Sequence, residues 1–551
     1  MKTKKKLLLF VILILIAGLY SVNYFRHAQT ISTTGDIAFH LSRIKGLSSI
    51  LSGPINFTTF NSYGSGVNYF YPYLTLFPSV IFYWITNNLI VSYILYVWVL
   101  NVCTILLMFY YGQKFLKRVD AAFLFSCLYT FYSYRTIDIY HRSAIAEAIA
   151  LTIMPVVLYY AYKMIYEKAT AAIPLAISMS LLVYTHVLST FMCAFFIGMM
   201  IIGKLIVNKL NKEETIRLVL EMSKAVGMTI LLTAYFWYPM FKQTMYQSIN
   251  QPGKTDLQNQ AINVSDSLIG AMNNDLASFT IGIIGIVSLI LPLVYFKKLT
   301  SKEKVIYLIA VATWLLSTKL VPWALLQNTP VRLLQFPWRI LGFQVLFGSL
   351  ILSIVFNRMV FGQKKRILGI AAIVCFMFVV SAATKANYNH KVPTLGDHLE
   401  VNKDTLGSYI TVGVGGVFDY APLEAMKYKE HVQKHEIRVD NEWQTAAYKA
   451  SDSKIVYTVK GAKDKKITLP VFDYWGTTAK VNGQNTKIEN NEGLATFEGK
   501  AGTTVIEVSS KYPFTMILAF IVSLGSYLFV FIRFLIGKCF VSKKTERFVN
   551  I

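Results

Sequence analysis

The chain alternates long apolar runs with short polar segments, and this pattern predicts a protein that crosses a membrane many times. A helix needs about 20 mainly apolar residues to span a hydrocarbon layer of ~30 Å, and runs near that length recur along most of the sequence. We predict twelve spans, at about 7–25, 89–112, 119–137, 145–163, 169–186, 188–208, 218–240, 279–297, 303–319, 337–360, 366–384 and 513–537. A further apolar stretch, 71–86, is expected to form a short helix at the outer leaflet.

Short basic clusters set the predicted orientation. The chain starts with MKTKKK, and the other Lys and Arg clusters fall in loops that the twelve spans place on one side. Because basic loops stay in the cytoplasm, both termini are expected there, with the protein in the plasma membrane. No small-residue cleavage site follows the first apolar run, so we expect an uncleaved signal-anchor.

Composition agrees with a membrane protein and argues against a nucleic-acid-binding one. Hydrophobic residues make up 54% of the chain and charged residues 15%, yet the net charge is +25. The polar segment from Lys385 to Lys511 contains 17 Lys and Arg against 16 Asp and Glu, so the positive excess lies in the short loops. That distribution is typical of membrane topology and not of a nucleic-acid surface.

The polar segment 385–512 has the pattern of a separate β-rich domain. Apolar and polar residues alternate in KIVYTV, KITLPVF and TTVIEVSS, and Asn482–Gly483 is a hairpin signal. The predicted fold is a polytopic α-helical membrane protein of about twelve transmembrane helices with a C-terminal extracytoplasmic β-sandwich. The expected parts are a multi-span domain at 1–384 with its first outer loop at 26–88, the β-rich domain at 385–512, and a final span with a cytoplasmic tail at 513–551.

The five cysteines all fall in or beside apolar runs. The sequence has neither a CxxC pair nor a Cys/His spacing typical of metal ligands, so we expect neither a disulfide framework nor a zinc knuckle. No cofactor is indicated with certainty, and a divalent metal remains an open alternative.

The first candidate site follows the first span, in TTGDIAFHLSRIKG. Asp36, His40 and Arg43 are four and three residues apart, so a helix would bring them to one face. One interpretation is a juxtamembrane helix whose polar face, with these three residues, is simply solvated by water. The other is one wall of an active site, in which the Asp36 carboxylate is a general base beside the His40 imidazole.

A second group lies at the predicted outer turn before the fourth span. His141, Arg142 and Glu147 belong to YRTIDIYHRSAIAEAIA, which also contains Arg135 and Asp138. Glu147 falls at the start of the span, where an unpaired carboxylate is costly. These residues either form an ion-pair clamp that ties the turn or belong to a substrate site.

A third group, Arg332, Trp338 and Arg339, enters a later span from the same side, in TPVRLLQFPWRILGF. An arginine at a helix start can hold a phosphate, because its guanidinium and the free backbone N–H groups converge on the anion; interfacial Trp–Arg anchoring is the alternative. His186, in VYTHVLST, is either a hydrogen-bonded core histidine or part of the site. All these groups fall on the predicted outer face, which favours a cavity for a phosphorylated lipid.

Several of these motifs resemble the YfhO-type family of bacterial membrane proteins, which is similar to the GT-C superfamily of glycosyltransferases. The motifs are GDIAFHLSRIKGL, YHRSAIAEAIALTIMP, YTHVLSTF, LQFPWRILGF, VFDYAPLEA and LPVFDYWGTTAKVNGQ. They extend from the first outer loop to the β-rich segment, so the resemblance covers most of the chain.

The resemblance implies a GT-C-like fold that transfers a sugar from a polyprenyl-phosphate donor on the outer side of the membrane. By position, Asp36 is the expected base of the first outer loop. Arg339, and after it Arg142 and Arg332, are the expected ligands of the donor phosphate. Many GT-C enzymes have a second carboxylate directly after the first, whereas Ile37 follows Asp36 here, which leaves a metal requirement open.

The predicted function is therefore transfer of a sugar to a cell-envelope polymer, such as a teichoic acid or polysaccharide. The catalytic candidates are Asp36 and His40, and the substrate-binding candidates are Arg43, His141, Arg142, Glu147, His186, Arg332, Trp338 and Arg339. Expected partners are the lipid-linked sugar, the polymer acceptor, membrane lipid and a separate glycosyltransferase that makes the donor, without nucleic acid. Two alternatives stay open: a lipid or polysaccharide transporter or flippase, and a non-enzymatic scaffold for envelope assembly.

Overall fold

The computed structural model describes residues 3–25, 30–32, 34–207, 211–253, 255–359, 361–391, 400–412 and 417–549. Contacts divide the chain into two units, each assembled from three segments of sequence. Unit 1 contains residues 1–44, 76–156 and 253–415, and unit 2 contains residues 45–75, 157–252 and 416–551. The predicted parts at 1–384, 385–512 and 513–551 do not coincide with these units, and the predicted first outer loop at 26–88 is divided between them.

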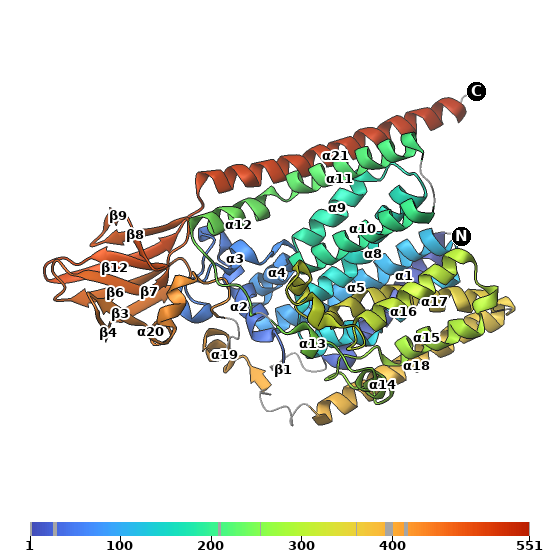
Figure 1. Cartoon of the computed structure of the whole chain (residues 1–551), viewed down its shortest axis with the longest axis horizontal. Helices are drawn as coiled ribbons and strands as arrows, with labels where there is room; N and C mark the ends of the chain where they lie inside the picture. The colour runs from blue at the N-terminus through green and yellow to red at the C-terminus, as the bar shows by residue number, and fades with distance from the viewer. Residues whose placement is uncertain are drawn as a thin grey trace. The chain divides into compact units, whose positions relative to one another are not determined.

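Unit 1 is a bundle of helices (Figure 1). Its long helices are α1 (Thr3–Tyr24), α5 (Leu89–Leu116), α17 (Leu341–Arg358) and α18 (Gln363–Lys391), and α8 (Ile145–Tyr166) begins in this unit. The shorter helices are α4 (Phe77–Thr86), α6 (Val119–Thr130), α13 (Leu257–Gln260), α14 (Val264–Met272), α15 (Gly282–Val294) and α16 (Ser301–Leu316). Local signals start two of them: the Asn88 side chain caps α5, and Thr300 with Glu303 forms a capping box on α16.

Short elements of unit 1 carry most of the candidate residues. They are α2 (Ile37–Leu47), α7 (Ser133–Thr136), the π-helical turn η4 (Ile137–His141), and the 3₁₀ turns η7 (Pro330–Leu334) and η8 (Pro337–Ile340). Two short strands, β1 (Thr30–Ser32) and β2 (Glu400–Asn402), form an antiparallel pair, and α19 (Leu406–Val412) follows β2.

Seven helices among the described residues are long and apolar enough to cross a membrane, or eight if a bent pair counts as one span. Four predicted spans contain shorter helices: α6 and α9 have 12 residues, α15 has 13 and α16 has 16. The stretch 71–86 contains the 10-residue helix α4. Twelve crossings are therefore not confirmed. An apolar run indicates burial in lipid or in protein equally well, so its length does not fix the length of the helix.

Unit 2 contains five helices of ten residues or more besides the end of α8, within its described part. They are α9 (Ala172–Val183), α10 (Val187–Val207), α11 (Lys212–Leu232), α12 (Ala234–Tyr246) and α21 (Phe514–Val549). α11 and α12 are the bent pair, with an angle of 72° between them. α21 lies along both of them (Figure 1).

The remainder of unit 2 contains a β-rich region with two five-stranded sheets. One has the order β10-β11-β7-β3-β4 and the other β5-β6-β12-β8-β9, with antiparallel neighbours throughout. The strands are β3 (Glu436–Val439), β4 (Glu442–Thr445), β5 (Ala447–Ser451), β6 (Lys454–Lys460), β7 (Lys466–Phe472), β8 (Thr477–Val481), β9 (Gln484–Thr486), β10 (Glu489–Asn491), β11 (Leu494–Glu498) and β12 (Thr503–Ser510).

The β-rich region confirms the strand pattern of the sequence. The three alternating motifs form β6, β7 and β12. Asn482 and Gly483 connect β8 to β9 with φ angles of 50° and 83°, which are the left-handed values that a two-residue hairpin requires. Both sheets contribute to one apolar core, which also contains Phe57 and Tyr69. The two five-stranded sheets start at Glu436, later than the predicted 385: α18 continues to Lys391, and β2, α19 and the short helix α20 (Lys429–Gln433) precede β3.

Candidate functional site

Glu147 is the centre of a buried network of charged side chains at the start of α8. Arg142 Nη1 lies 2.9 Å from Glu147 Oε2, and Arg339 Nε lies 3.4 Å from the same oxygen. Glu147 Oε1 accepts a hydrogen bond of 2.6 Å from the Tyr134 hydroxyl. Arg142 also forms an ion pair with Asp138, four residues before it. The structure thus contains the Arg142–Glu147 clamp, and Arg339 and Asp138 extend it.

The turn before α8 has an irregular backbone that brings Asp138 and Arg142 together. Ile137–His141 is a π-helical turn, in which the Arg142 N–H donates to the Ile137 carbonyl at 2.9 Å. The Ala144 N–H then donates to the Asp138 carbonyl at 2.9 Å, and Ser143 has a φ of 51°. Single π turns are frequent at functional sites.

Trp338 forms an aromatic stack beside the charged network. Its ring is nearly parallel to those of Phe279 and Phe336, with centroid distances of 4.1 and 4.8 Å. The Arg142 guanidinium carbon lies 4.3 Å from the Trp338 ring centroid. A guanidinium over an aromatic face is stabilised by the ring quadrupole. Arg142 is therefore held both by its ion pairs with Asp138 and Glu147 and by its contact with the Trp338 ring.

Arg339 and Arg142 differ in how much of their charge is already paired. Arg339 Nη1 donates to the Gln335 Oε1 atom at 2.8 Å and to the Leu334 carbonyl at 3.1 Å, both neutral oxygens. Its contact with Glu147 is the longer of that carboxylate's two ion pairs. Arg332, on η7, is exposed and has no ion-pair partner within the described residues.

Asp36 is connected to this network by a hydrogen bond to the backbone of Arg142. The Asp36 N–H donates to the Arg142 carbonyl oxygen at 2.7 Å. The preceding Gly35 has a φ of +58°, and a Cβ atom there would lie 1.9 Å from that same oxygen. Only glycine allows so close an approach in this conformation. The Gly35–Asp36 pair thus attaches the Asp36 backbone to the turn that precedes α8.

The Asp36 carboxylate is accessible to solvent, and the charges around it shift its pKa. Partial loss of water around the group raises its pKa above the ordinary value of 3.8. The positive charges of Arg142 and Arg339 act in the opposite direction, and the negative charge of Glu147 acts in the same one. A raised pKa makes a carboxylate a stronger base once it is deprotonated.

His40 and Arg43 are buried, whereas Asp36, which was expected to share one helix face with them, is exposed. α2 begins at Ile37, directly after Asp36, and the His40 N–H donates to the Asp36 carbonyl at 3.0 Å. The His40 and Arg43 side chains are only 1% and 2% exposed. The first turn of α2 thus fixes the Asp36 backbone, while the two side chains pack inside the protein.

His141 lies on the same turn but contacts a different set of groups. Its Nδ1 is 3.2 Å from the Tyr388 hydroxyl, which donates to the Thr34 hydroxyl at 3.2 Å. Burial lowers the pKa of His141, the Arg142 charge adds to this effect, and Asp275 opposes it. His141 is therefore expected to be neutral near pH 7, as a connector between α18 and the segment that leads to Asp36.

His186 belongs to unit 2, where its neighbours include Ser189 and Tyr71. It precedes α10 (Val187–Val207), and its Nδ1 lies 2.8 Å from the Ser189 hydroxyl. Its ring centroid is 6.3 Å from that of Tyr71. These contacts agree with the hydrogen-bonded core histidine that the sequence left open.

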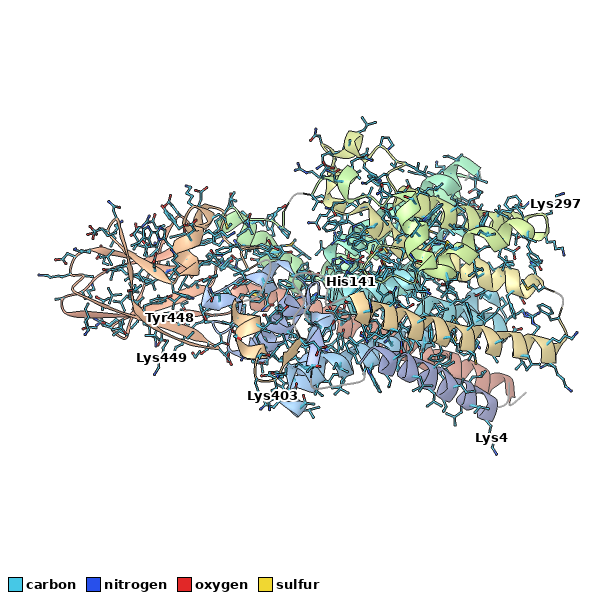
Figure 2. The ribbon with its side chains drawn as sticks, turned by 90° about the horizontal axis from the view of Figure 1, so that it is seen from below. Lys4, His141, Lys297, Lys403, Tyr448 and Lys449 are labelled. Carbon is cyan, nitrogen blue, oxygen red and sulfur yellow. The ribbon has the colours of Figure 1, made fainter. Side chains whose placement is uncertain are left out.

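The charged network and the basic loops lie at opposite ends of α17. Arg339 precedes this helix and Arg358 ends it, and its 18 residues span about 27 Å. At the far end, Arg358 pairs with Glu303 at 2.7 Å and Arg366 with Asp120 at 2.9 Å. Figure 2 shows Lys4 and Lys297 at one end of the unit 1 helices and His141 well away from both. Unit 1 thus has a basic end and a candidate-site end.

A metal site is not formed by the described side chains: no group of three or more His, Cys, Asp and Glu residues among them could hold an ion. The carboxylates of Asp138 and Glu147 face guanidinium groups instead.

Several residues of this network are not among the substrate-binding candidates chosen from the sequence. Asp138 belongs to the same sequence group as Arg142 and lies four residues before it, a spacing that favours a pair, but it is not one of those candidates. Tyr134 and Gln335 bond to Glu147 and Arg339, but a neutral residue near a charge in sequence gives no such signal. Phe279 reaches Trp338 only in the tertiary structure.

Comparison with known proteins places the chain in a family of membrane proteins. Residues 67–389, more than half of the chain, match a family model described as 6-pyruvoyl-tetrahydropterin synthase related domain, membrane protein. The matched region contains Arg142, Glu147 and Arg339, whereas Asp36 and the β-rich region lie outside it. No curated protein matches the chain. The chain belongs to the 6-pyruvoyl-tetrahydropterin synthase related family of membrane proteins.

Proposed function

We propose that the protein is a GT-C-type membrane glycosyltransferase that moves a sugar from a polyprenyl-phosphate donor to a cell-envelope polymer. The observation that carries this proposal is the position of Asp36. Its carboxylate is accessible, its backbone bonds to Arg142, and its pKa responds to both Arg142 and Arg339. A base that is influenced electrostatically by two guanidinium groups suits a reaction in which a hydroxyl is deprotonated while a phosphate departs.

The proposed reaction assigns one step to each kind of group. The acceptor hydroxyl oxygen attacks the anomeric carbon of the sugar, and Asp36 accepts the hydroxyl proton. The bond between that carbon and the phosphate oxygen breaks, and the lipid phosphate leaves with the electron pair. Guanidinium groups stabilise the negative charge that develops on this oxygen.

Arg339 is the better phosphate ligand of the two arginines. Arg142 already faces the carboxylates of Asp138 and Glu147. Arg339 has one carboxylate contact at 3.4 Å and otherwise bonds to neutral oxygens. More of its positive charge is therefore available to an incoming anion. In this proposal Arg142 stabilises the turn to which the Asp36 backbone is hydrogen-bonded. Arg332, which is exposed, contributes to the approach of the donor.

The outer side of the membrane is the proposed location of the reaction. Basic loops tend to stay in the cytoplasm, and the candidate site lies at the opposite end of α17 from Arg358 and Arg366. A lipid-linked donor fits that location, because its lipid keeps the sugar at the membrane surface. A separate glycosyltransferase would supply this donor. The acceptor would be a teichoic acid or polysaccharide.

The test measures sugar release from a radiolabelled polyprenyl-phosphate sugar in membranes that contain equal amounts of wild type or variant. Asp36→Asn keeps the shape of the side chain and removes the base, so we expect a loss of about 100-fold or more in donor consumption. Asp266→Asn is the matched control, because Asp266 is an exposed carboxylate on α14 whose contacts are with Asn263 and Ser265.

Two results would overturn the proposal. Equal donor consumption by the wild type and Asp36→Asn would remove Asp36 as the base. Absence of consumption by the wild type, with envelope fractions supplied as acceptors, would favour the transporter or scaffold alternatives.

A further inference from the structure

A long apolar cavity in unit 1 is distinct from the charged site. It has a volume of about 610 Å³, and none of the charged residues around Glu147 is among its lining residues. Its walls come from α6, α15, α17 and α18. The α18 residues that line it, between Lys365 and Thr384, mostly lie three or four positions apart or are direct neighbours, so one face of the helix forms the wall.

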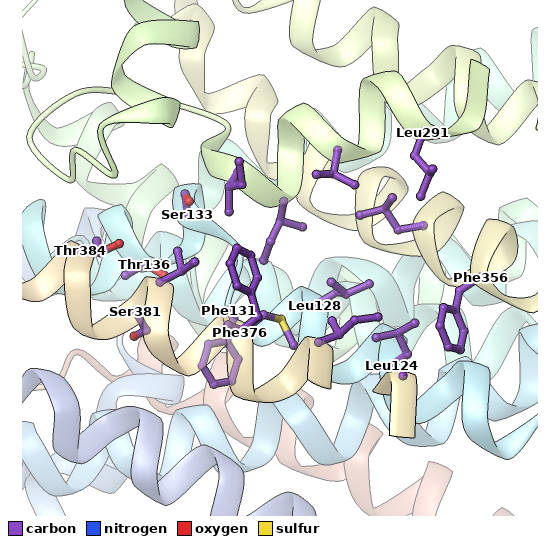
Figure 3. A pocket seen from close by; sticks show the side chains of 18 of the residues that line it. Leu124, Leu128, Phe131, Ser133, Thr136, Leu291, Phe356, Phe376, Ser381 and Thr384 are labelled. Atoms are coloured by element: carbon purple, nitrogen blue, oxygen red, sulfur yellow. The ribbon is translucent and has the colours of Figure 1, made fainter. Parts of the chain in front are cut away.

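The two ends of this cavity differ in chemistry. One end is lined by hydroxyl groups, from Ser133, Thr136, Ser381 and Thr384. The other end is apolar, and Figure 3 shows the labelled Leu124, Leu291 and Phe356 there, away from the labelled hydroxyl residues. Only the second end contains a charged lining residue, Lys365.

Lys365 is the one charged residue among the residues that line the cavity, and it lies at the basic end of unit 1. Two neighbouring arginines there are paired: Arg366 with Asp120 at 2.9 Å and Arg358 with Glu303 at 2.7 Å. Lys365 is exposed and has no carboxylate within ion-pair distance among the described residues. An apolar cavity whose mouth carries an unpaired cation is complementary to a lipid with an anionic headgroup.

We propose that this cavity holds an acyl chain of an anionic phospholipid whose phosphate lies at Lys365. The wall from Lys365 to Met377 is apolar apart from Lys365 and is about 18 Å long at ~1.5 Å per residue. One leaflet of a bilayer has a hydrocarbon depth of about 15 Å, half of ~30 Å, so the wall matches one acyl chain. The hydroxyl groups begin beyond the reach of such a chain.

The direction of the lipid follows from the same residues. Anionic headgroups are attracted to Lys and Arg beside a membrane span, and basic pockets between helices bind them. A lipid inserted from the hydroxyl end would place its phosphate near neutral Ser133 and Thr384 and leave Lys365 without an anion. The proposal concerns lipid binding and no sugar transfer, so its test is independent of the proposed transferase activity.

The experiment measures lipid retention by the purified full-length protein with native mass spectrometry, after titration with phosphatidylglycerol or phosphatidylcholine of identical chains. We expect the wild type to bind phosphatidylglycerol more tightly. Lys365→Gln should weaken that binding roughly fivefold and leave phosphatidylcholine unchanged, because one basic residue is removed. Lys364→Gln is the matched control, since Lys364 is exposed but does not line the cavity.

A second pair of variants tests the acyl chain. Gly369→Trp places a large ring inside the cavity one turn from Lys365 and should lower the binding of both lipids. Leu368→Trp is its control, because Leu368 is 68% exposed and does not line the cavity.

Three outcomes would overturn the proposal. Phosphatidylglycerol binding by Lys365→Gln could equal that of the wild type, or the wild type could bind the two lipids equally. A polyprenyl phosphate that displaces phosphatidylglycerol one for one would assign the cavity to that lipid. The Lys365→Gln comparison decides the matter even if Gly369→Trp fails to fold.

Discussion

The backbone N–H of Asp36 donates to the carbonyl oxygen of Arg142 at 2.7 Å. This bond joins the segment after α1 to the turn before α8, and it puts an accessible carboxylate beside a buried cluster of two arginines and two acids. The bond depends on the close approach of Gly35.

Gly35→Ala should displace Asp36. A Cβ atom at position 35 would lie 1.9 Å from the Arg142 carbonyl oxygen, and the φ of +58° is unfavourable for alanine. We expect a loss of stability of about 1–3 kcal/mol together with a loss of donor consumption. Thermal unfolding and the radiolabelled-sugar assay measure the two effects. Gly18→Ala, where a Cβ meets nothing within 4 Å inside α1, should lower neither stability nor activity, and unchanged activity in Gly35→Ala would contradict the prediction.

Arg142→Gln should destabilise the protein more than the loss of any exposed ion pair. It leaves Asp138 and Glu147 buried without their nearest cation, at a cost of about 3–5 kcal/mol. Addition of Asp138→Asn should restore part of that stability, because one of the uncompensated charges is removed. Thermal unfolding of the single and double variants measures the coupling. Arg118→Gln, at an exposed pair with Asp120, is the control, and independent effects of the two substitutions would refute the network.

Asp36→Asn should abolish activity without lowering the stability of the protein at pH 7. The raised pKa of Asp36 means that the folded protein binds this proton more tightly than the unfolded chain does. The resulting stabilisation is complete below the ordinary pKa of 3.8 and is lost as the pH rises through the raised value. At pH 7 the variant, which carries no charge there, should unfold at the same or a higher temperature than the wild type.

The same shift predicts the pH profile of the wild-type reaction. A general base works when it is deprotonated, so the acid limb of donor consumption should lie above pH 3.8. A variant that is inactive but also less stable than the wild type at pH 7 would indicate a structural role for Asp36.

His435 in the β-rich region should make unit 2 sensitive to acid. Its Nε2 donates to the Asn61 carbonyl at 2.8 Å, and its Nδ1 lies 3.0 Å from the Tyr457 hydroxyl. Burial lowers its pKa from the ordinary 6.5, so its stabilising contribution is complete above pH 6.5 and is lost as the pH falls toward the lowered value.

The variant His435→Gln should remove this acid sensitivity. Its unfolding temperature should be lower than that of the wild type at pH 8 and should fall less between pH 7 and pH 5. His390→Gln changes an exposed histidine on α18 and should leave the pH dependence unchanged. Equal acid sensitivity in the wild type and His435→Gln would contradict the prediction.

Parts of this protein follow directly from the sequence. Apolar runs predicted membrane helices, and alternation in KIVYTV, KITLPVF and TTVIEVSS predicted strands that the structure contains. Asn482–Gly483 predicted a hairpin with left-handed φ angles. These features depend on local periodicity and on the conformations of single residues, so a few neighbouring positions are enough to specify them.

The candidate site depended on contacts that no local pattern contains. Asp36, Glu147 and Arg339 come from three distant segments, and their proximity arises from the packing of α8, α17 and the Gly35 turn. The same packing buried His40 and Arg43, which the sequence placed on one helix face with Asp36. Helices and strands form where apolar runs and alternating segments occur in the sequence, because these elements follow from short-range periodicity. Which charges are paired, buried or accessible was decided by the tertiary structure, because electrostatic neighbours and water exclusion are set by segments far apart in the chain.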